Sequence, residues 1–134
     1  MINSDFALGV HALLLLAASE EGRLTSGYLS EKLKVHPVRI RSLLSKIKNK
    51  GFIESKEGIN GGFSISCDIS EISLKDIYLI TQEDILKPKC HDCCPTCIGS
   101  SNIEKVLDGI LIGADQKCRD YLEKYTLKDV LNMI

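Results

Sequence analysis

The stretch PVRIRSLLSKIKNKGFIESKEGINGGFSIS, from Pro37 to Ser66, decides the fold. Its first half predicts a helix from Pro37 to Lys50. Proline suits the first turn of a helix, where its missing N–H is not needed, and Gly51 ends the segment. Four apolar residues repeat at the spacing of one helical face, namely Ile40, Leu43, Leu44 and Ile47. The polar residues between them are left to face outward.

The second half of this stretch predicts a hairpin. Phe52–Ser55 and Phe63–Ser66 are short strand candidates, and Phe63–Ser66 alternates apolar and polar residues. The connection from Lys56 to Gly62 contains three glycines and an asparagine, residues that adopt the positive φ of a hairpin tip. A basic helix followed at once by a glycine-rich hairpin is typical of a winged helix-turn-helix.

The residues upstream complete the motif. Phe6–Ala18 has the pattern of a first helix, with Asp5 as the expected N-cap. A short second helix follows, with Ser26 as its expected cap, and Val35-His36-Pro37 forms a sharp turn before the basic helix. Two short helices around a tight turn are the signature of a helix-turn-helix.

Charge is distributed unevenly along the chain. The net charge is only −1, but residues 32–56 contain eight basic residues and one acid, whereas residues 67–134 contain eight basic and twelve acidic residues. A local basic patch on a near-neutral chain is an electrostatic footprint for phosphate. The alternative for a basic run alone is a solvated helix face.

Downstream of the hairpin, two capping patterns begin helices. Ser73–Asp76 begins a short helix, and Ser101–Glu104 begins a helix of about 20 residues, the longest periodic run in the chain. We interpret it as a dimer helix, because a small head domain cannot cover its apolar stripe alone. Thr126–Ile134 is expected to form a short closing helix. The stripe consists of Ile103, Val106, Leu107, Ile110, Leu111, Ala114, Cys118, Tyr121 and Leu122.

The predicted fold class is therefore mainly α (α+β). We expect a winged helix-turn-helix DNA-binding domain over residues 1–80, with a two-stranded wing. A cysteine-rich loop over residues 81–100 would be the sensor, and residues 101–134 would hold the long C-terminal dimerisation helix and the closing helix.

Six segments, in order along nearly the whole chain, resemble the Rrf-two family of bacterial regulators, which includes IscR-like, NsrR-like and CymR-like proteins. The segment Gly58–Phe63 (GINGGF) is similar to the wing signature G-x-x-G-G-Y. Ile72–Ile77 and Thr126–Val130 are similar to the segments that follow the wing and close the chain. The other three are Asp5–Ala17, Thr25–Leu33 and Lys50–Ile53.

The resemblance implies a homodimer that binds double-stranded DNA at a palindromic operator, most often as a repressor. The wing tip from Lys56 to Gly62, including Gly58, Asn60 and Gly61, would lie near the minor groove. Several members have arginine immediately before the first wing glycine, whereas this chain has Glu57. Ser26 and Lys46 complete the predicted DNA-binding set. Carried over by position, the residues of the helix that meets bases are His36, Val38, Arg39, Arg41 and Ser42.

The segment CHDCCPTC, from Cys90 to Cys97, is the sharpest chemical feature. Thiolates are soft ligands for iron–sulfur clusters or zinc. Cluster-binding members of the family use three cysteines in this loop, which implies Cys90, Cys97 and either Cys93 or Cys94 as ligands. These cysteines are closer together than in those members, and one zinc held by all four would be strained.

Three interpretations of the loop stay open: a cluster that senses iron, nitric oxide or oxidant, thiols that oxidise reversibly, and a loop with no sensing role. Cys67 and Cys118 are expected to be buried small hydrophobes. Asp5 stands where some family members supply a carboxylate ligand, although helix capping is the preferred interpretation.

Other classes of function are disfavoured. The chain has no phosphate-binding loop and no recognisable nucleophile–base arrangement, so an enzyme is not expected. A protein-interaction module, or a ligand-responsive regulator without a cluster, is the alternative function. The apolar run Ala12–Ala18 is too short for a membrane span, and Met1–His11 has no Lys or Arg, so the charge pattern of a signal peptide is missing. A cytoplasmic location is therefore expected.

Overall fold

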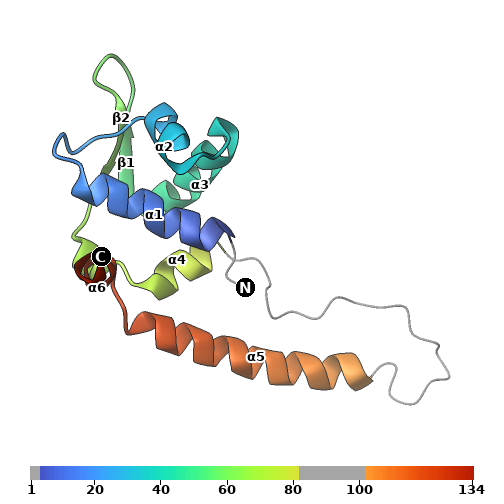
Figure 1. Ribbon diagram of the computed structural model, residues 1–134. Coiled ribbons are helices and arrows are strands. Elements are labelled where there is room, and N and C mark those ends of the chain that lie inside the picture. The colour runs from blue at the N-terminus through green and yellow to red at the C-terminus, as the bar shows by residue number, and fades with distance from the viewer. Residues whose placement is uncertain (1–3, 82–101) are drawn as a thin grey trace.

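The computed structural model describes residues 4–81 and 102–134 (Figure 1). Its elements, in chain order, are α1 (Ser4–Ala18), α2 (Ser26–Leu33), α3 (Pro37–Asn49), β1 (Ile53–Lys56), β2 (Gly62–Ile65), the 3-10 helix η1 (Ile69–Glu71), α4 (Leu74–Ile80), α5 (Asn102–Glu123) and α6 (Leu127–Met133).

The core lies where α1, α2, α3 and the hairpin meet. Helix α1 supplies the largest share, because Leu8, Ala12, Leu13, Leu14 and Leu16 are all buried. Helix α3 presents Ile40, Leu43, Leu44 and Ile47 to the same core, which is the face expected from its spacing. Burying each of these aliphatic side chains stabilises the fold by about 1.5–3 kcal/mol. The opposite face of α3 is thereby fixed toward solvent.

The wing is an antiparallel hairpin in which Ile53 pairs with Ile65 and Lys56 with Gly62. The loop before α2 adds a short third edge: the Leu24 and Phe63 backbones exchange two hydrogen bonds of 2.9 and 2.7 Å. The hairpin is consequently anchored at its base to the segment that leads into the helix-turn-helix.

The C-terminal segment returns to the head domain. Ser73 and Thr126 pair in an isolated bridge, and each heads a capping box, with Asp76 and Asp129 as the respective partners. Leu127 at the start of α6 is fully buried in the core. The last helix therefore packs with η1 and α1, while α5 packs on α4.

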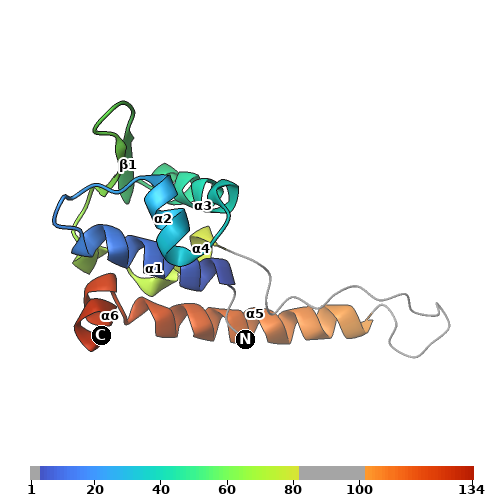
Figure 2. The same ribbon diagram turned by 45° about the horizontal axis from the view of Figure 1, so that its top comes forward.

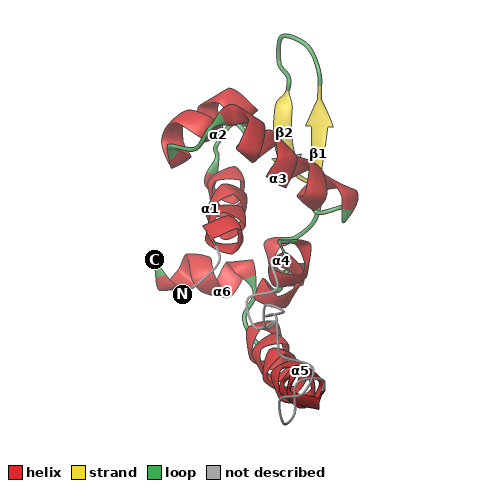
Figure 3. Ribbon diagram, turned by 90° about the vertical axis from the view of Figure 1, so that its right-hand side faces the viewer, coloured by secondary structure: helices red, strands yellow, loops and turns green. Residues whose placement is uncertain are grey.

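The wing and α5 lie at opposite ends of the molecule (Figures 1 and 3). Helix α5 runs below the head domain, and its N-terminal half extends past it (Figure 2). Among the described residues, no helix combines the length and the apolar character needed to cross a bilayer.

The predicted winged helix-turn-helix is confirmed, with boundaries that shift by one or two residues. Two expected caps were wrong. Thr25, not Ser26, caps α2, since its hydroxyl accepts the Tyr28 N–H. Asp5 lies inside the first turn of α1 rather than at its cap.

Candidate DNA-binding face

The turn between α2 and α3 is held by three hydrogen bonds around Ser30. Lys34 and Val35 donate their backbone N–H groups to the Ser30 carbonyl, and the Ser30 hydroxyl donates to the Val35 carbonyl at 2.5 Å. Lys34 adopts the left-handed conformation with φ of 55°. This closed turn sets the angle at which α3 leaves α2.

His36 caps α3. Its Nδ1 atom accepts the Val38 N–H at 3.2 Å, and Pro37 follows at the first helical position. This acceptor role requires Nδ1 to be unprotonated, so only the Nε2 edge of the ring could face a partner. The sequence pointed to His36 as a base contact, and its capping role was missed because histidine is not a common cap.

The solvent-facing side of α3 carries the predicted contact residues. Val38, Arg39, Arg41, Ser42 and Lys46 are all exposed. A hollow of about 310 Å³ opens beside them, lined by Asp5, His36, Val38, Arg39, Ser42, Leu43 and Lys46. The structure thus brings together five of the predicted residues, whereas Arg41 does not line the hollow and Ser26 is half-buried on α2.

An ion pair ties this face to α1. Both Nε and Nη2 of Arg39 donate to Asp5 Oδ1, at 3.0 and 2.5 Å, and both side chains are partly exposed. A carboxylate therefore stands within the cationic surface of α3. The sequence could not indicate this pair, because its members are 34 residues apart and belong to different helices.

The wing tip is a closed turn. The Gly61 N–H donates to the Gly58 carbonyl at 3.0 Å, and Gly58 has a φ of 104°. A Cβ on Gly61 would lie 2.5 Å from the Lys56 carbonyl oxygen, so glycine is required there. Lys56, Gly58 and Asn60 are exposed.

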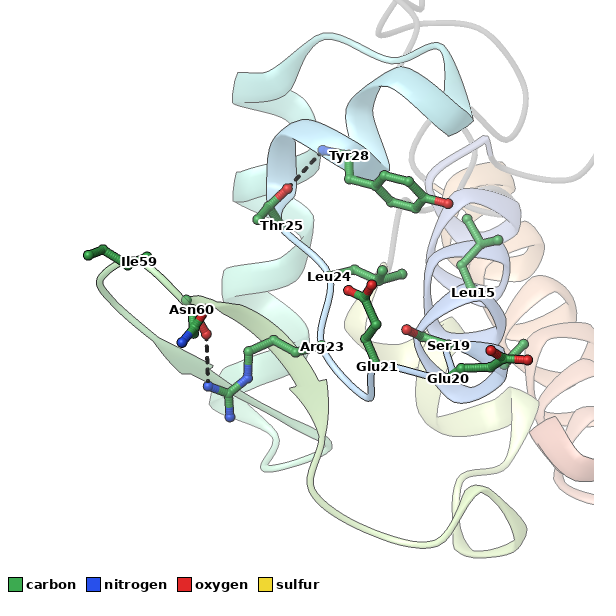
Figure 4. Close-up of a pocket in the computed structure, with 12 residues that line it drawn as sticks. Leu15, Ser19, Glu20, Glu21, Arg23, Leu24, Thr25, Tyr28, Ile59 and Asn60 are labelled. Carbon is green, nitrogen blue, oxygen red and sulfur yellow. Dashed lines mark hydrogen bonds between the residues drawn. The ribbon is translucent and has the colours of Figure 1, made fainter.

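Arg23 reaches the wing tip from the α1–α2 loop. Its Nη1 donates to the Asn60 carbonyl at 3.4 Å (Figure 4). It helps to line an open groove of about 910 Å³ between the end of α1, the α2 start and the wing tip. Sequence reasoning missed Arg23, which lies outside the basic run of residues 32–56.

Helix α5 leaves apolar residues uncovered. Leu111, Ala114 and Leu122 are half-buried, in keeping with the packing of α5 on α4. A second row of large side chains is exposed: Ile103, Val106, Leu107, Ile110 and Tyr121. Ile103, Val106, Leu107 and Ile110 follow the i, i+3, i+4, i+7 spacing of one helical face.

A polar contact fixes α5 on α4. The Tyr78 hydroxyl donates a hydrogen bond to Asp115 Oδ1. Arg119 and Asp115 also form an ion pair, with Nε 2.7 Å from Oδ2. On the other side, the Tyr78 ring lies edge-on to Phe6 of α1, with centroids 6.4 Å apart.

The hydrogen bond to Asp115, followed by burial and by the Asp115 charge, raises the pKa of Tyr78 to about 12. Folding favours the protonated phenol, so this contribution to stability is complete below the ordinary tyrosine pKa of about 10. It is lost as the pH rises through about 12.

We therefore expect phenolate absorbance of the folded protein to show a component that titrates near pH 12, which Tyr78→Phe removes. Tyr125→Phe is the comparison: the pKa of Tyr125 is also raised, there by its hydrogen bond with Tyr121, so this variant should remove a separate late-titrating phenol and leave the component near pH 12 in place. A titration that is unchanged by Tyr78→Phe would contradict the assignment.

The predicted ligand cysteines Cys90, Cys93, Cys94 and Cys97 lie outside the described residues. Within residues 4–81 and 102–134, no three or more His, Cys, Asp or Glu side chains gather to hold a metal ion. Cys67 is half-buried, and burial together with nearby Glu71 raises the pKa of its thiol, which disfavours the reactive thiolate. Cys118 is exposed on α5, so its expected burial was wrong for the single protomer.

Comparison with known proteins places this geometry in a family. Residues 2–133 match the model of the Rrf2 family, described as iron-dependent transcriptional regulator. The chain is 28% identical over 133 residues to YwnA of Bacillus subtilis (strain 168), named as a HTH-type transcriptional regulator, with 98% of each chain covered. It is 25% identical over 142 residues to the regulator IscR of Vibrio atlanticus, covering 96% of this chain and 82% of that one.

A solved structure has a similar fold. The crystal structure of a transcriptional regulator from Lactobacillus plantarum superposes with a TM-score of 0.80 at 26% identity, covering 94% of this chain and 86% of that chain. Relatives and family alike are regulators of transcription and not enzymes. The chain belongs to the Rrf2 family of winged helix-turn-helix, DNA-binding transcriptional regulators.

Proposed function

We propose that this regulator is a homodimer that binds a palindromic operator as a repressor, with α3 in the major groove and the wing beside the minor groove. The observation that carries the proposal is the exposed cationic face of α3, whose apolar face is fully engaged by the core. A second helix of this kind places its N-terminal residues against base edges.

The proposed roles follow the chemistry of each side chain. Arg39 and Arg41 contact guanine edges, since guanidinium pairs bidentately with the O6 and N7 atoms of guanine. Val38, exposed at the start of α3, suits the methyl group of thymine. Ser26, Lys46 and Lys56 contact phosphates, which position the protein without reading sequence. Ser42 and the Nε2 edge of His36 complete the major-groove set.

The test is selection of bound duplexes from a random-sequence pool by the full chain. We expect a palindromic consensus with half-sites one helical turn apart, and an affinity that falls steeply with salt. A chain that enriches no sequence and shows no salt dependence would contradict DNA reading and favour a protein-interaction module.

The Asp5–Arg39 pair makes a separate prediction about specificity. Asp5→Asn removes a negative charge from the proposed DNA face, so affinity for random duplex should rise and the salt slope should steepen by about one phosphate equivalent. Fluorescence anisotropy at several salt concentrations measures both quantities. In an Arg39→Ala background the rise should be smaller, because no arginine is then released from its pair with Asp5. An equal rise in both backgrounds would mean that Asp5 does not act through Arg39.

The proposed homodimer uses the exposed row of α5. Four of its residues, Ile103, Val106, Leu107 and Ile110, belong to the N-terminal half of α5, which extends past the head domain (Figure 2), and their side chains are exposed. Burying it against a second copy removes large aliphatic side chains from water, which is the main favourable term in association.

The proposed sensor is the cysteine loop that precedes α5. Its donor set fits an iron–sulfur cluster, because three or four thiolates within eight residues are the ligands such clusters use. Cys90, Cys97 and either Cys93 or Cys94 would hold it, and a bound cluster would supply redox and nitric oxide chemistry. The family description as iron-dependent supports this assignment.

Absorption spectra and metal analysis of protein purified without oxygen test the sensor. A brown protein with iron and sulfide supports the cluster, and Cys97→Ala should then abolish the colour while Cys67→Ala retains it. A colourless protein without iron contradicts the cluster and leaves zinc, reversible thiol oxidation or a loop without a sensing role.

A further inference from the structure

Ile59, at the tip of the wing, is an exception to the rule that large apolar side chains are buried. Ile59 is fully exposed, at 104% of its reference surface, whereas the hairpin's other large apolar residues, Ile53, Phe63 and Ile65, are buried or half-buried. In Figure 4 it lies at the tip of the hairpin, at the outer end of the groove that it helps to line. It therefore contributes nothing to the core and is presented at the tip.

The backbone holds Ile59 in a fixed position. It follows Gly58 in the turn closed by the Gly61 N–H and the Gly58 carbonyl. The neighbouring Asn60 carbonyl accepts the hydrogen bond from Arg23, which links the tip to the α1–α2 loop. An apolar side chain on an anchored turn loses little conformational freedom when it binds.

The charges around Ile59 indicate the kind of partner. Two cations from different elements lie at the wing tip, Lys56 at its hairpin end and Arg23 bonded to the Asn60 carbonyl, together with one exposed acid, Glu57. An exposed apolar side chain on a tip that carries more basic than acidic residues suits the DNA minor groove, whose negative potential attracts Arg and Lys and whose sugars and base edges accept apolar side chains.

We propose that Ile59 is a specificity-determining residue that contacts the minor groove and selects A·T over G·C pairs there, with Arg23 as the positioning residue of the tip. This inference rests on the proposed DNA-binding function. In the minor groove, G·C differs from A·T by the guanine N2 amino donor. Isoleucine covers that donor without accepting its hydrogen bond, which leaves a polar group desolvated and unpaired.

The experiment uses base analogues that change only the minor-groove edge. In the duplex selected by the full chain, 2,6-diaminopurine replaces adenine in each flanking A·T pair and thereby adds the amino group. Wild-type affinity should fall about tenfold at the position that Ile59 touches. Inosine in place of guanine, which removes the amino group, should restore affinity to a duplex weakened by a G·C pair there.

The variants separate apolar contact from stability. Ile59→Ser should lose this discrimination, with the two duplexes binding within about twofold of each other, while Ile59→Val retains it. Met133→Ser, at an exposed apolar residue on α6, is the matched control and should discriminate as wild type does. Arg23→Ala should weaken the discrimination through the tip.

Two failures are distinguishable. If the wild-type chain selects a duplex but binds its diaminopurine derivatives as tightly as the original, the inference about Ile59 is overturned and DNA reading stands. The same holds if Ile59→Ser discriminates like wild type. If the wild-type chain selects no duplex at all, the proposed function fails first and the inference with it.

Discussion

Replacing Arg39 and Arg41 together with alanine should reduce affinity for the selected duplex by about 100-fold or more. Each bidentate arginine–guanine contact discriminates by about 1–3 kcal/mol, and the two residues share the exposed face of α3. Fluorescence anisotropy at fixed salt is the measurement. The dimer should remain intact, because α3 lies far from α5 (Figure 3).

The control for this double variant is a matched loss of charge elsewhere. Lys117→Ala with Lys128→Ala removes two exposed cations from α5 and α6, so affinity should change little. Each single variant removes one positive charge, but Arg39→Ala also takes the guanidinium away from the Asp5 carboxylate on the same face, so it should weaken binding at least as much as Arg41→Ala. Unchanged affinity in the double variant would show that α3 is not the DNA-contacting surface.

Introducing one carboxylate into the exposed row of α5 should separate the subunits. Ile110 is 61% exposed in the single chain, and in the proposed dimer Ile110→Glu would bury a charge in an apolar interface from both copies. The dissociation constant should rise about 100-fold or more, because an unpaired buried charge costs several kcal/mol. Sedimentation at several protein concentrations measures it.

Ile112 provides the control within the same helix. It is also exposed, at 68%, but lies two residues from Ile110 and so faces almost the opposite side. Ile112→Glu should leave the dimer as it is, and a monomer in both variants would mean general destabilisation of α5. Truncation before Ser101 is a poorer test, since it would also remove Leu127 from the core and α5 from α4.

Local pattern predicted most of the fold because its causes are local. The apolar spacing of α3, the capping pairs at Ser73 and Thr126, and the glycines of the wing each act within one or two helical turns. The cap of α2 was misplaced by one residue because Thr25 and Ser26 are adjacent hydroxyl residues of similar capping strength. Backbone geometry, which the sequence does not reveal, decides between them.

The contacts of the DNA-binding face were harder to foresee because they are distant in sequence. Arg39 donates hydrogen bonds to Asp5, 34 residues away in sequence, and Arg23 donates to the Asn60 carbonyl, 37 residues away. The composition of residues 32–56 located the cationic helix correctly, but neither a carboxylate on its face nor a cation beside the wing follows from that composition. Cys118 was expected to be buried but is exposed. The helical periodicity could not tell which apolar positions of α5 face α4 and which face solvent.

The first turn of α1 has neighbours on two sides, since Asp5 bonds the α3 arginine and Phe6 touches Tyr78, whose hydroxyl is bonded to α5. Suppose that a displacement of α5 changes the free energy of the Asp5–Arg39 pair. Binding of Arg39 to a nucleotide must then change the free energy of that displacement by the same amount. Operator binding and dimerisation would then be thermodynamically coupled. The coupling free energy could be measured either as the change in the dimer dissociation constant on adding operator or as the change in operator affinity on dimerisation.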